Sequence, residues 1–183
     1  MSRRIAAVLF ASLLASPALA EDAKPAAAPP VGAEPQTTTA SYGDWTLRCQ
    51  RLADPAAPSK LCEISLTIQA GQQPAPIAQI AMGRLAKTDP YHLTAHVPTN
   101  ISLPSVVKFS TGDKDAHSQE LAWRRCAPAG CFADSTLTDA QWKGLHGQTD
   151  AGSLEFIDAV GRPVKLPVSF RGLAQAMDAL IKE

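Results

Sequence analysis

The stretch WTLRCQRLADPAAPSKLCEISLTI, residues 45–68, carries the pattern that decides the fold of this chain. Apolar and polar residues alternate from Trp45 to Cys49 and again from Cys62 to Ile68, which is typical of strands that bury one face. The residues between these two runs include two prolines and predict a hairpin loop. This hairpin would place Cys49 opposite Cys62, with both cysteines on the core-facing side of their strands.

The first residues, MSRRIAAVLFASLLASPALAED, have the pattern of a secretory signal peptide over residues 1–20. Arg3 and Arg4 precede an apolar run from Ile5 to Ala15, and an A-x-A site follows at residues 18–20. A membrane-spanning helix needs about 20 apolar residues, and this run is nearer half that length. We therefore expect an exported chain, in the periplasm, on the cell surface or secreted, with no transmembrane segment after cleavage.

Residues 21–40, EDAKPAAAPPVGAEPQTTTA, are rich in Pro and Ala and contain no aromatic residue. Such a segment buries too little apolar surface to offset the entropy of ordering it, so we expect a disordered tether. A single domain over residues 41–183 would follow it. The whole chain has 17 Lys and Arg against 17 Asp and Glu, and loss of Arg3 and Arg4 leaves it slightly acidic. This charge favours neither nucleic acid nor an anionic membrane as a partner.

A second cysteine pair, Cys126 and Cys131, lies in the segment RRCAPAGCF. Four cysteines in an exported chain are expected to form two disulfides, and three pairings are possible in principle. The predicted hairpin favours the sequential pairing, Cys49 with Cys62 and Cys126 with Cys131. Pro128 and Gly130 predict a tight turn between strands, whereas a redox motif is typically Cys-x-x-Cys at the start of a helix. Zinc is disfavoured because no second pair has matching spacing.

The remainder of the domain reads as short strands with Gly and Pro between them. We expect a mainly β fold, an antiparallel β-sandwich of immunoglobulin-like type, with a closed barrel as the alternative. A short helix is predicted over residues 139–146, with Thr138 as its N-cap and with Trp142 and Leu145 packing on the sheets. The final predicted element is an amphipathic C-terminal helix, whose apolar residues are Leu173, Ala176, Met177 and Leu180.

The histidines and the paired aspartates do not form a recognisable metal or catalytic motif. His92 and His96 lie four apart in an alternating strand, which separates their Cα atoms by about 13 Å, too far for one metal ion. Asp113 and Asp115 resemble the start of a calcium loop but lack its other ligands, and His146 has no nucleophile tied to it by a motif. These residues are therefore interpreted as exposed polar positions, and we expect no metal and no cofactor.

Arg124 and Arg125, directly before Cys126, are candidates for contact with an anion or a partner. Successive side chains of a strand point to opposite faces. If Trp123 points inward, Arg124 would face solvent, and Arg125 would need a partner or a place at the rim of the sheet.

Several segments together resemble the invasion-associated locus B (IalB) family of exported bacterial proteins. They are YGDWTLRC, LCEISLTI, HVPTNISLPSVVKFS, LAWRRCAPAGCFA and VKLPVSFRGLAQAMDAL, between Tyr42 and Leu180. The resemblance implies a compact β-sandwich with two disulfides and a role linked to the entry of bacteria into host cells. It supplies no catalytic residues.

Two functions remain open from the sequence. The first is a non-enzymatic interaction protein of the periplasm or envelope, resembling invasion-associated locus B, whose partner is a protein of the envelope or of a host cell. The alternative is a periplasmic thiol-disulfide helper or oxidoreductase that uses Cys126 and Cys131.

Overall fold

The computed structural model describes residues 36–53, 60–69, 75–112 and 118–183. The predicted signal peptide, residues 21–35 of the predicted tether, and Asp113 and Asp115 lie outside these ranges.

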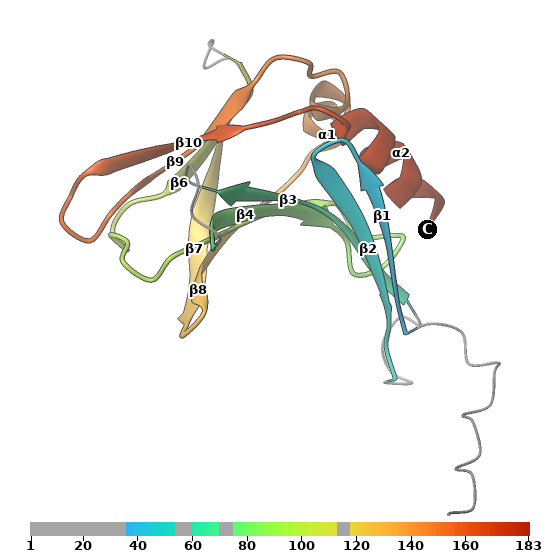
Figure 1. The fold of residues 1–183 in the computed structure, drawn as a ribbon, viewed down its shortest axis with the longest axis horizontal. Coiled ribbons are helices and arrows are strands. Elements are labelled where there is room, and N and C mark those ends of the chain that lie inside the picture. Colours follow the sequence, from blue (N-terminus) through green and yellow to red (C-terminus); the bar gives the residue numbers. More distant parts are fainter. Residues whose placement is uncertain (1–35, 54–59, 70–74, 113–117) are drawn as a thin grey trace, which may run out of the picture. The chain divides into compact units, whose positions relative to one another are not determined.

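Ten strands and two helices make up the described part of the chain (Figure 1). The strands are β1 (Thr37–Tyr42), β2 (Trp45–Arg51), β3 (Lys60–Gln69), β4 (Pro76–Gly83), β5 (His92–Val97), β6 (Val107–Ser110), β7 (Gln119–Ala127), β8 (Gly130–Thr136), β9 (Gly152–Ile157) and β10 (Pro163–Val168). The helices are α1 (Asp139–His146) and α2 (Leu173–Lys182). The strands form one antiparallel sheet in the order β1-β2-β3-β4-β5-β8-β7-β6-β9-β10.

Strand β7 is the corner at which this sheet folds over. Its first residues, Gln119–Leu121, pair with β6, and its later residues, from Ala122 onward, pair with β8. The layer of β6, β9 and β10 therefore turns back over the larger layer, and β10 contacts β3 across the core (Figure 1). The predicted sandwich-like, mainly β fold is confirmed, although one continuous sheet supplies both layers. Among the described residues β1 and β10 do not pair with each other, so the barrel alternative is not the fold.

The alternation read from the sequence places the core as expected. In β2, Trp45, Leu47 and Cys49 are buried, while the residues between them are exposed or half-buried. Their neighbours in the core come from both layers of the sheet. The largest completely buried side chains include Trp45, Phe109, Ile64, Ile80, Met82, Leu93, Leu121 and Leu154.

The two helices occupy the predicted residues. A capping box between Thr138 and Gln141 begins α1, because the Thr138 side chain accepts from the Gln141 backbone and the Gln141 side chain accepts from the Thr138 backbone. Leu145 is buried, as predicted, whereas Trp142 is half-buried and stacks on Tyr91 with ring centroids 3.8 Å apart.

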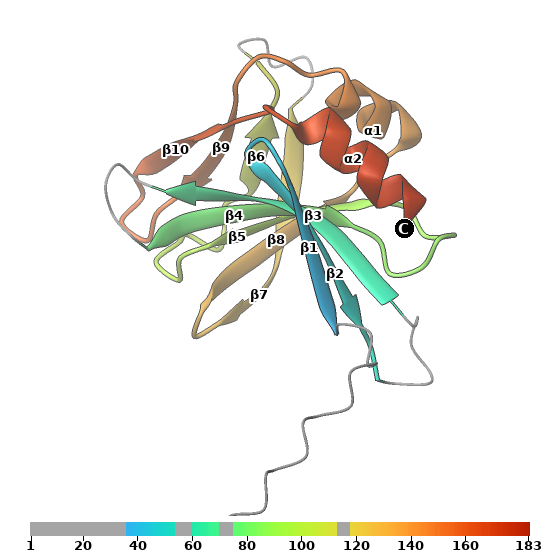
Figure 2. The same cartoon turned by 45° about the vertical axis from the view of Figure 1, so that its right-hand side comes forward.

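Helix α2 packs beside the first three strands, as Figure 2 shows. Its four apolar residues at helical spacing are all buried, and α1 also contacts it. At the end of the helix, Glu183 pairs with Lys60 at the start of β3.

The predicted end of the tether at Ala40 is wrong. Residues Thr37–Ala40 belong to β1, which pairs with β2 over its whole length. These residues are exposed, so they carried no apolar alternation that would predict a strand. The backbone pairing with β2 orders them instead, and such pairing leaves no trace in side-chain composition.

Candidate functional site

The two cysteine pairs form disulfides, Cys49 with Cys62 and Cys126 with Cys131. In each pair the cysteines are register partners on neighbouring antiparallel strands. Cys126 and Cys131 close the β7–β8 hairpin and lie in strands rather than at a helix N-terminus, which is where a thiolate is usually stabilised. The geometry is that of a clip between two strands.

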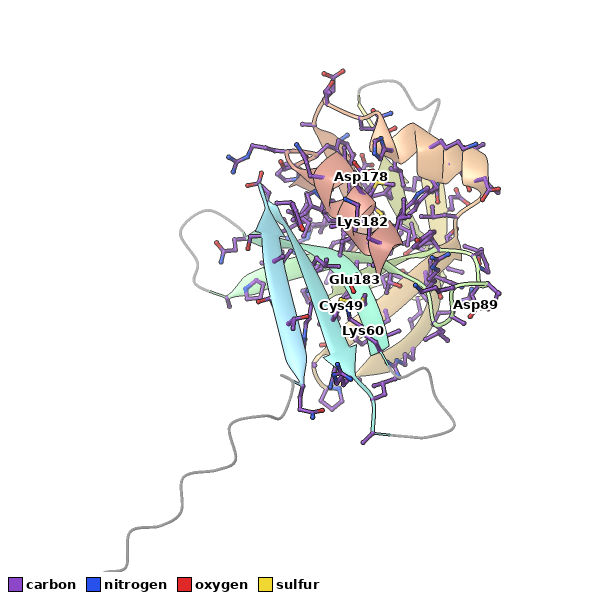
Figure 3. The ribbon with its side chains drawn as sticks, turned by 90° about the vertical axis from the view of Figure 1, so that its right-hand side faces the viewer. Cys49, Lys60, Asp89, Asp178, Lys182 and Glu183 are labelled. Carbon is purple, nitrogen blue, oxygen red and sulfur yellow. A yellow bond between two sulfur atoms is a disulfide. The ribbon has the colours of Figure 1, made fainter. Side chains whose placement is uncertain are left out.

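One group of possible metal ligands occurs in the described ranges, formed by Cys49, Cys62 and Glu183. In the view of Figure 3, the labelled Cys49 lies between Glu183 above and Lys60 below. Both cysteines are already in a disulfide, so neither sulfur is the thiolate that zinc binds. The carboxylate of Glu183 is also engaged with Lys60, and this group therefore does not fit a zinc site.

A β-bulge in β7 changes the predicted orientation of the two arginines. Trp123 pairs with Ala133 and Arg125 pairs with Phe132, so Arg124 is an extra residue between two register positions. Because one residue is unpaired at a bulge, the alternation of side chains shifts there. The prediction of opposite faces is wrong: Arg124 binds Asp134 and Arg125 lies over Phe132, and these two residues of β8 line one hollow.

We call this solvent-facing side of β5, β8 and β7 the outer face. Across it runs a ladder of three side chains, one from each strand. His96 of β5 stacks on Phe132 of β8, with ring centroids 4.4 Å apart, and the Arg125 guanidinium lies 5.0 Å from the Phe132 centroid. Residues on the three strands are register partners, so the sheet itself aligns the ladder. Stacking and cation–π attraction hold the rings in place.

Asp134 is the acidic centre of the outer face. Its carboxylate accepts from Arg124 Nε, and His92 Nδ1 lies 3.6 Å from its other oxygen. It lies two residues from Phe132 and so points to the same side of the sheet. His92 and His96 are both half-buried on this side, as the alternating pattern predicts, and each has a different partner.

A hollow of about 500 Å³ lies over the outer face and extends onto β3 and β4. Its lining combines two imidazoles, an aromatic ring, carboxylates and an arginine with short polar and apolar side chains. The residues that line it include Glu63, Leu85, His92, His96, Phe132 and Asp134. They contain no serine, threonine or free cysteine in a hydrogen bond with a base, as far as the structure describes them. The hollow is thus equipped to hold polar and aromatic groups of a partner.

Sequence reasoning did not single out Phe132 and Asp134. The signal was present in CFADST, where period-two alternation places these two residues opposite the buried Cys131 and Ala133. What the alternation could not reveal is that β5 and β7 flank β8, so that β5 brings histidines to one side of it and β7 brings arginines to the other.

His146 lies apart from the outer face. Its Nε2 is 3.0 Å from Asp178 Oδ1, so it links the end of α1 to α2. This contact between the helices accounts for the residue without a catalytic role.

Two of the segments that carried the family resemblance meet at a joint, which we define as residues 42–45 with residues 169–172. Asp44 accepts hydrogen bonds from Ser169 Oγ at 2.6 Å and from Arg171 Nε at 3.1 Å, and Trp45 Nε1 donates to the Ser169 carbonyl at 2.9 Å. The Arg171 guanidinium first, and then the Ser169 hydroxyl, hold the pKa of Asp44 below its ordinary value.

Gly172 makes this joint possible. Its φ is +88°, and a Cβ added there would lie 1.9 Å from the Tyr42 carbonyl oxygen. Only glycine allows the two backbones to approach so closely in this conformation. The joint fastens the β1–β2 turn to the start of α2.

No helix in the described part of the chain is both long and apolar enough to cross a membrane.

Comparison with known proteins agrees with the fold and the motifs. The family model described as invasion associated locus B (IalB) protein matches residues 45–181. The crystal structure of invasion associated protein B from Bartonella henselae aligns with a TM-score of 0.67 and 21% identity, covering 79% of this chain and 95% of that one. No curated protein matches the chain. The family match spans most of the chain and includes both sides of the joint, and the chain therefore belongs to the invasion associated locus B family.

Proposed function

We propose that this chain is an exported, non-enzymatic interaction protein of the bacterial envelope, which binds a protein partner through the hollow on its outer face. The observation that carries the proposal is the ladder of His96, Phe132 and Arg125 beside the Arg124–Asp134 pair. His96, Phe132 and Asp134 of this group line the hollow of about 500 Å³. Aromatic and arginine side chains are the residues most enriched at the energetic centres of protein interfaces.

Export rests on the sequence of residues 1–20, and the partner class rests on the size and chemistry of the hollow. An open surface with an aromatic ring between charged groups suits side chains of a protein better than a buried small molecule. Family membership supports a partner on a host cell, because the relative from Bartonella henselae is described as invasion associated.

Site-specific photo-crosslinking tests this proposal. Leu85 lines the hollow and is 68% exposed, and Val160, at the β9–β10 turn, is 73% exposed and does not line it. A photoreactive amino acid at Leu85 should capture one specific protein from envelope extracts or host-cell membranes, and the same group at Val160 should not. Equal capture at both positions, or no specific capture at Leu85, would contradict the proposal.

Alanine substitutions of two basic residues, one in the ladder and one outside it, test whether capture depends on the ladder. Arg125→Ala should reduce capture at Leu85, whereas Lys143→Ala, an exposed basic residue of α1, should leave it unchanged. If both variants are captured as well as the parent chain, the partner does not use the ladder.

The thiol-disulfide alternative is not favoured, because Cys126 and Cys131 clip two strands together. A structural disulfide of this kind should have a reduction potential below about −300 mV, and a catalytic one should lie well above it. Equilibration of the protein with thiol buffers of known potential measures this value directly.

A further inference from the structure

The two edges of the ten-stranded sheet, β1 and β10, expose different backbone groups. In an antiparallel ladder, one residue directs both its N–H and its C=O to one neighbouring strand, and the next residue directs them the opposite way. On the β10 side, Asp158 N–H donates to the Arg162 carbonyl at 2.9 Å. The even-numbered residues of β10 therefore bond to β9, and the odd-numbered residues, Pro163, Lys165 and Pro167, face outward.

The edge at β10 is consequently closed to further pairing. Two of its three outward positions are prolines, which have no N–H to donate. The third is a lysine, the residue that most often protects edge strands from pairing with other chains.

The edge at β1 has none of these devices. Arg51 N–H donates to the Gln36 carbonyl at 2.9 Å, so even-numbered residues of β1 bond to β2 and the odd-numbered ones face outward. These are Thr37, Thr39 and Ser41, which together offer three N–H and three C=O groups to another strand.

The composition and exposure of β1 suit an added strand. Residues Thr37–Ser41 are all exposed, and β1 contains neither charge nor proline. Beside it, a hollow of about 260 Å³ runs between β1 and α2 and is lined in part by Ala40, Leu47 and Ala179. The segment that precedes β1 in the sequence contains four prolines between residues 25 and 35, and so it is poorly suited to pair with this edge.

We propose that β1 is a self-association site, at which a second copy of this chain adds its own β1 in antiparallel orientation. A two-fold axis through Thr39 pairs Thr39 with Thr39 of the second copy and Thr37 with Ser41 in both directions. Every outward N–H and C=O of the two strands then has a partner.

The side chains agree with the same register. Thr38 and Ala40 are register partners of Cys49 and Leu47 on the core-facing side of β2, so they share that side. In the two-fold arrangement Thr38 lies opposite Ala40 of the second copy, two small residues that do not clash. On the solvent side Thr39 meets Thr39, a cross-strand pair that stabilises sheets. An uncharged strand avoids the repulsion that a charged residue on a two-fold axis creates, and so β1 fits a second copy of itself.

Light scattering on the purified chain, coupled to size-exclusion chromatography, measures the association. The dimer fraction should rise with concentration, and Thr39→Pro should weaken dimerisation about tenfold or more, because each copy loses one outward N–H. The Thr39 N–H makes no bond to β2, so the monomer should keep its unfolding temperature. Thr39→Val keeps the backbone donor and serves as the matched control.

Charged substitutions of Thr39, at the two-fold axis, provide a second test. This test does not require that β1 fold normally with a proline at this position. Thr39→Lys alone and Thr39→Glu alone should each be monomeric, because like charges meet across the axis. An equimolar mixture should restore a dimer of one copy of each. A parent chain that stays monomeric up to about 1 mM would overturn the proposal.

Two other results would also overturn it: a dimer that persists in both charged variants, or a mixture that stays monomeric although the parent chain dimerises. Capture of a foreign extended peptide that Thr39→Pro abolishes, with a monomeric parent chain, would assign the edge to another protein and not to self-association. The outer face can fail or succeed as a partner site independently, because the crosslinking positions, Leu85 and Val160, lie in loops outside β1.

Discussion

The joint and the outer face are built from different strands of the sheet, and they contain different kinds of sequence. At the joint, two motifs far apart in the chain, YGDW and SFRG, meet through Asp44, Arg171 and Gly172. On the outer face, Phe132, Asp134 and the two arginines come from the single β7–β8 hairpin, and the neighbouring β5 adds His92 and His96. Two of the segments that carry the family resemblance thus maintain the fold, whereas a third, LAWRRCAPAGCFA, contributes Arg124, Arg125 and Phe132 to the candidate binding surface.

The largest expected difference is between two glycines of similar backbone conformation. Gly172→Ala should lower the free energy of unfolding by about 3 kcal/mol or more, since the added Cβ meets the Tyr42 backbone in addition to the cost of the left-handed conformation. Gly161 has φ +84° but nothing within 4 Å of its Cβ position, so Gly161→Ala should cost only about 1 kcal/mol. Urea denaturation of both variants measures the difference, and equal losses would remove the close approach as the reason for Gly172.

Removal of each disulfide should also lower the free energy of unfolding, and the two losses should differ by less than the losses from the two glycine substitutions. The Cys49–Cys62 bond has a sequence separation of 13, and Cys126–Cys131 a separation of 5. In the chain-entropy description, removal of the first by paired alanine substitutions should cost about 3 kcal/mol and removal of the second about 2 kcal/mol.

Denaturation of both double variants, with the parent chain as reference, tests this order. A larger loss for the hairpin clip would mean that the outer face depends on its disulfide more than the β2–β3 hairpin does. That result would place the clip in the architecture of the candidate site and not only at its end.

A smaller effect on stability is expected from the ladder of the outer face. Phe132→Ala removes stacking with His96 and the cation–π contact with Arg125, and should cost about 1 kcal/mol. Its effect on partner capture should be much larger than its effect on folding. Phe132→Leu, which keeps apolar volume without the ring, separates the two effects: if it restores both stability and capture, the aromatic ring itself is not required.

The smallest expected effect is a shift in acid stability that originates at the joint. The pKa of Asp44 is lowered by its hydrogen bonds to Arg171 and Ser169, so its ionised form stabilises the folded state above the ordinary carboxyl pKa of about 3.9. This stabilisation is lost as the pH falls from that value through the lower folded-state pKa.

Replacement of Asp44 by Asn should therefore make stability less dependent on pH below about 4. Asp150→Asn, at an exposed position outside the joint, is the control. Thermal unfolding between pH 2 and 7 gives both profiles, and parallel profiles for the parent and the Asp44 variant would show that this carboxylate does not contribute to acid sensitivity.

Most of the fold could be predicted because burial leaves a periodic record. Trp45, Leu47 and Cys49 alternate, and α2 repeats its apolar residues at helical spacing, so strands and helix were identified without a structure. Strand β1 was missed because its residues are held by backbone hydrogen bonds, for which every residue except proline has both the donor and the acceptor. The order of strands in the single continuous sheet could not be predicted either, because it depends on contacts between strands that are distant in the sequence.

The candidate site was only partly predictable. The sequence identified Arg124 and Arg125 as notable, but strict alternation assigned them to opposite faces. A bulge of one residue reversed that assignment, and no feature of the sequence Arg124-Arg125 marks it.

The sequence by itself determined the β-rich class, the sequential pairing of the cysteines, the two helices and the resemblance to the family. Each of these follows from local periodicity, from spacing or from motif. The tertiary structure alone decided that β8 lies between β5 and β7, so that Arg124 binds Asp134 and Arg125 lies over Phe132. It also decided that β1 is an edge strand whose outward N–H groups are directed away from β2. These features depend on which strands become neighbours, and the free energy of the whole folded core selects that arrangement, not any single segment.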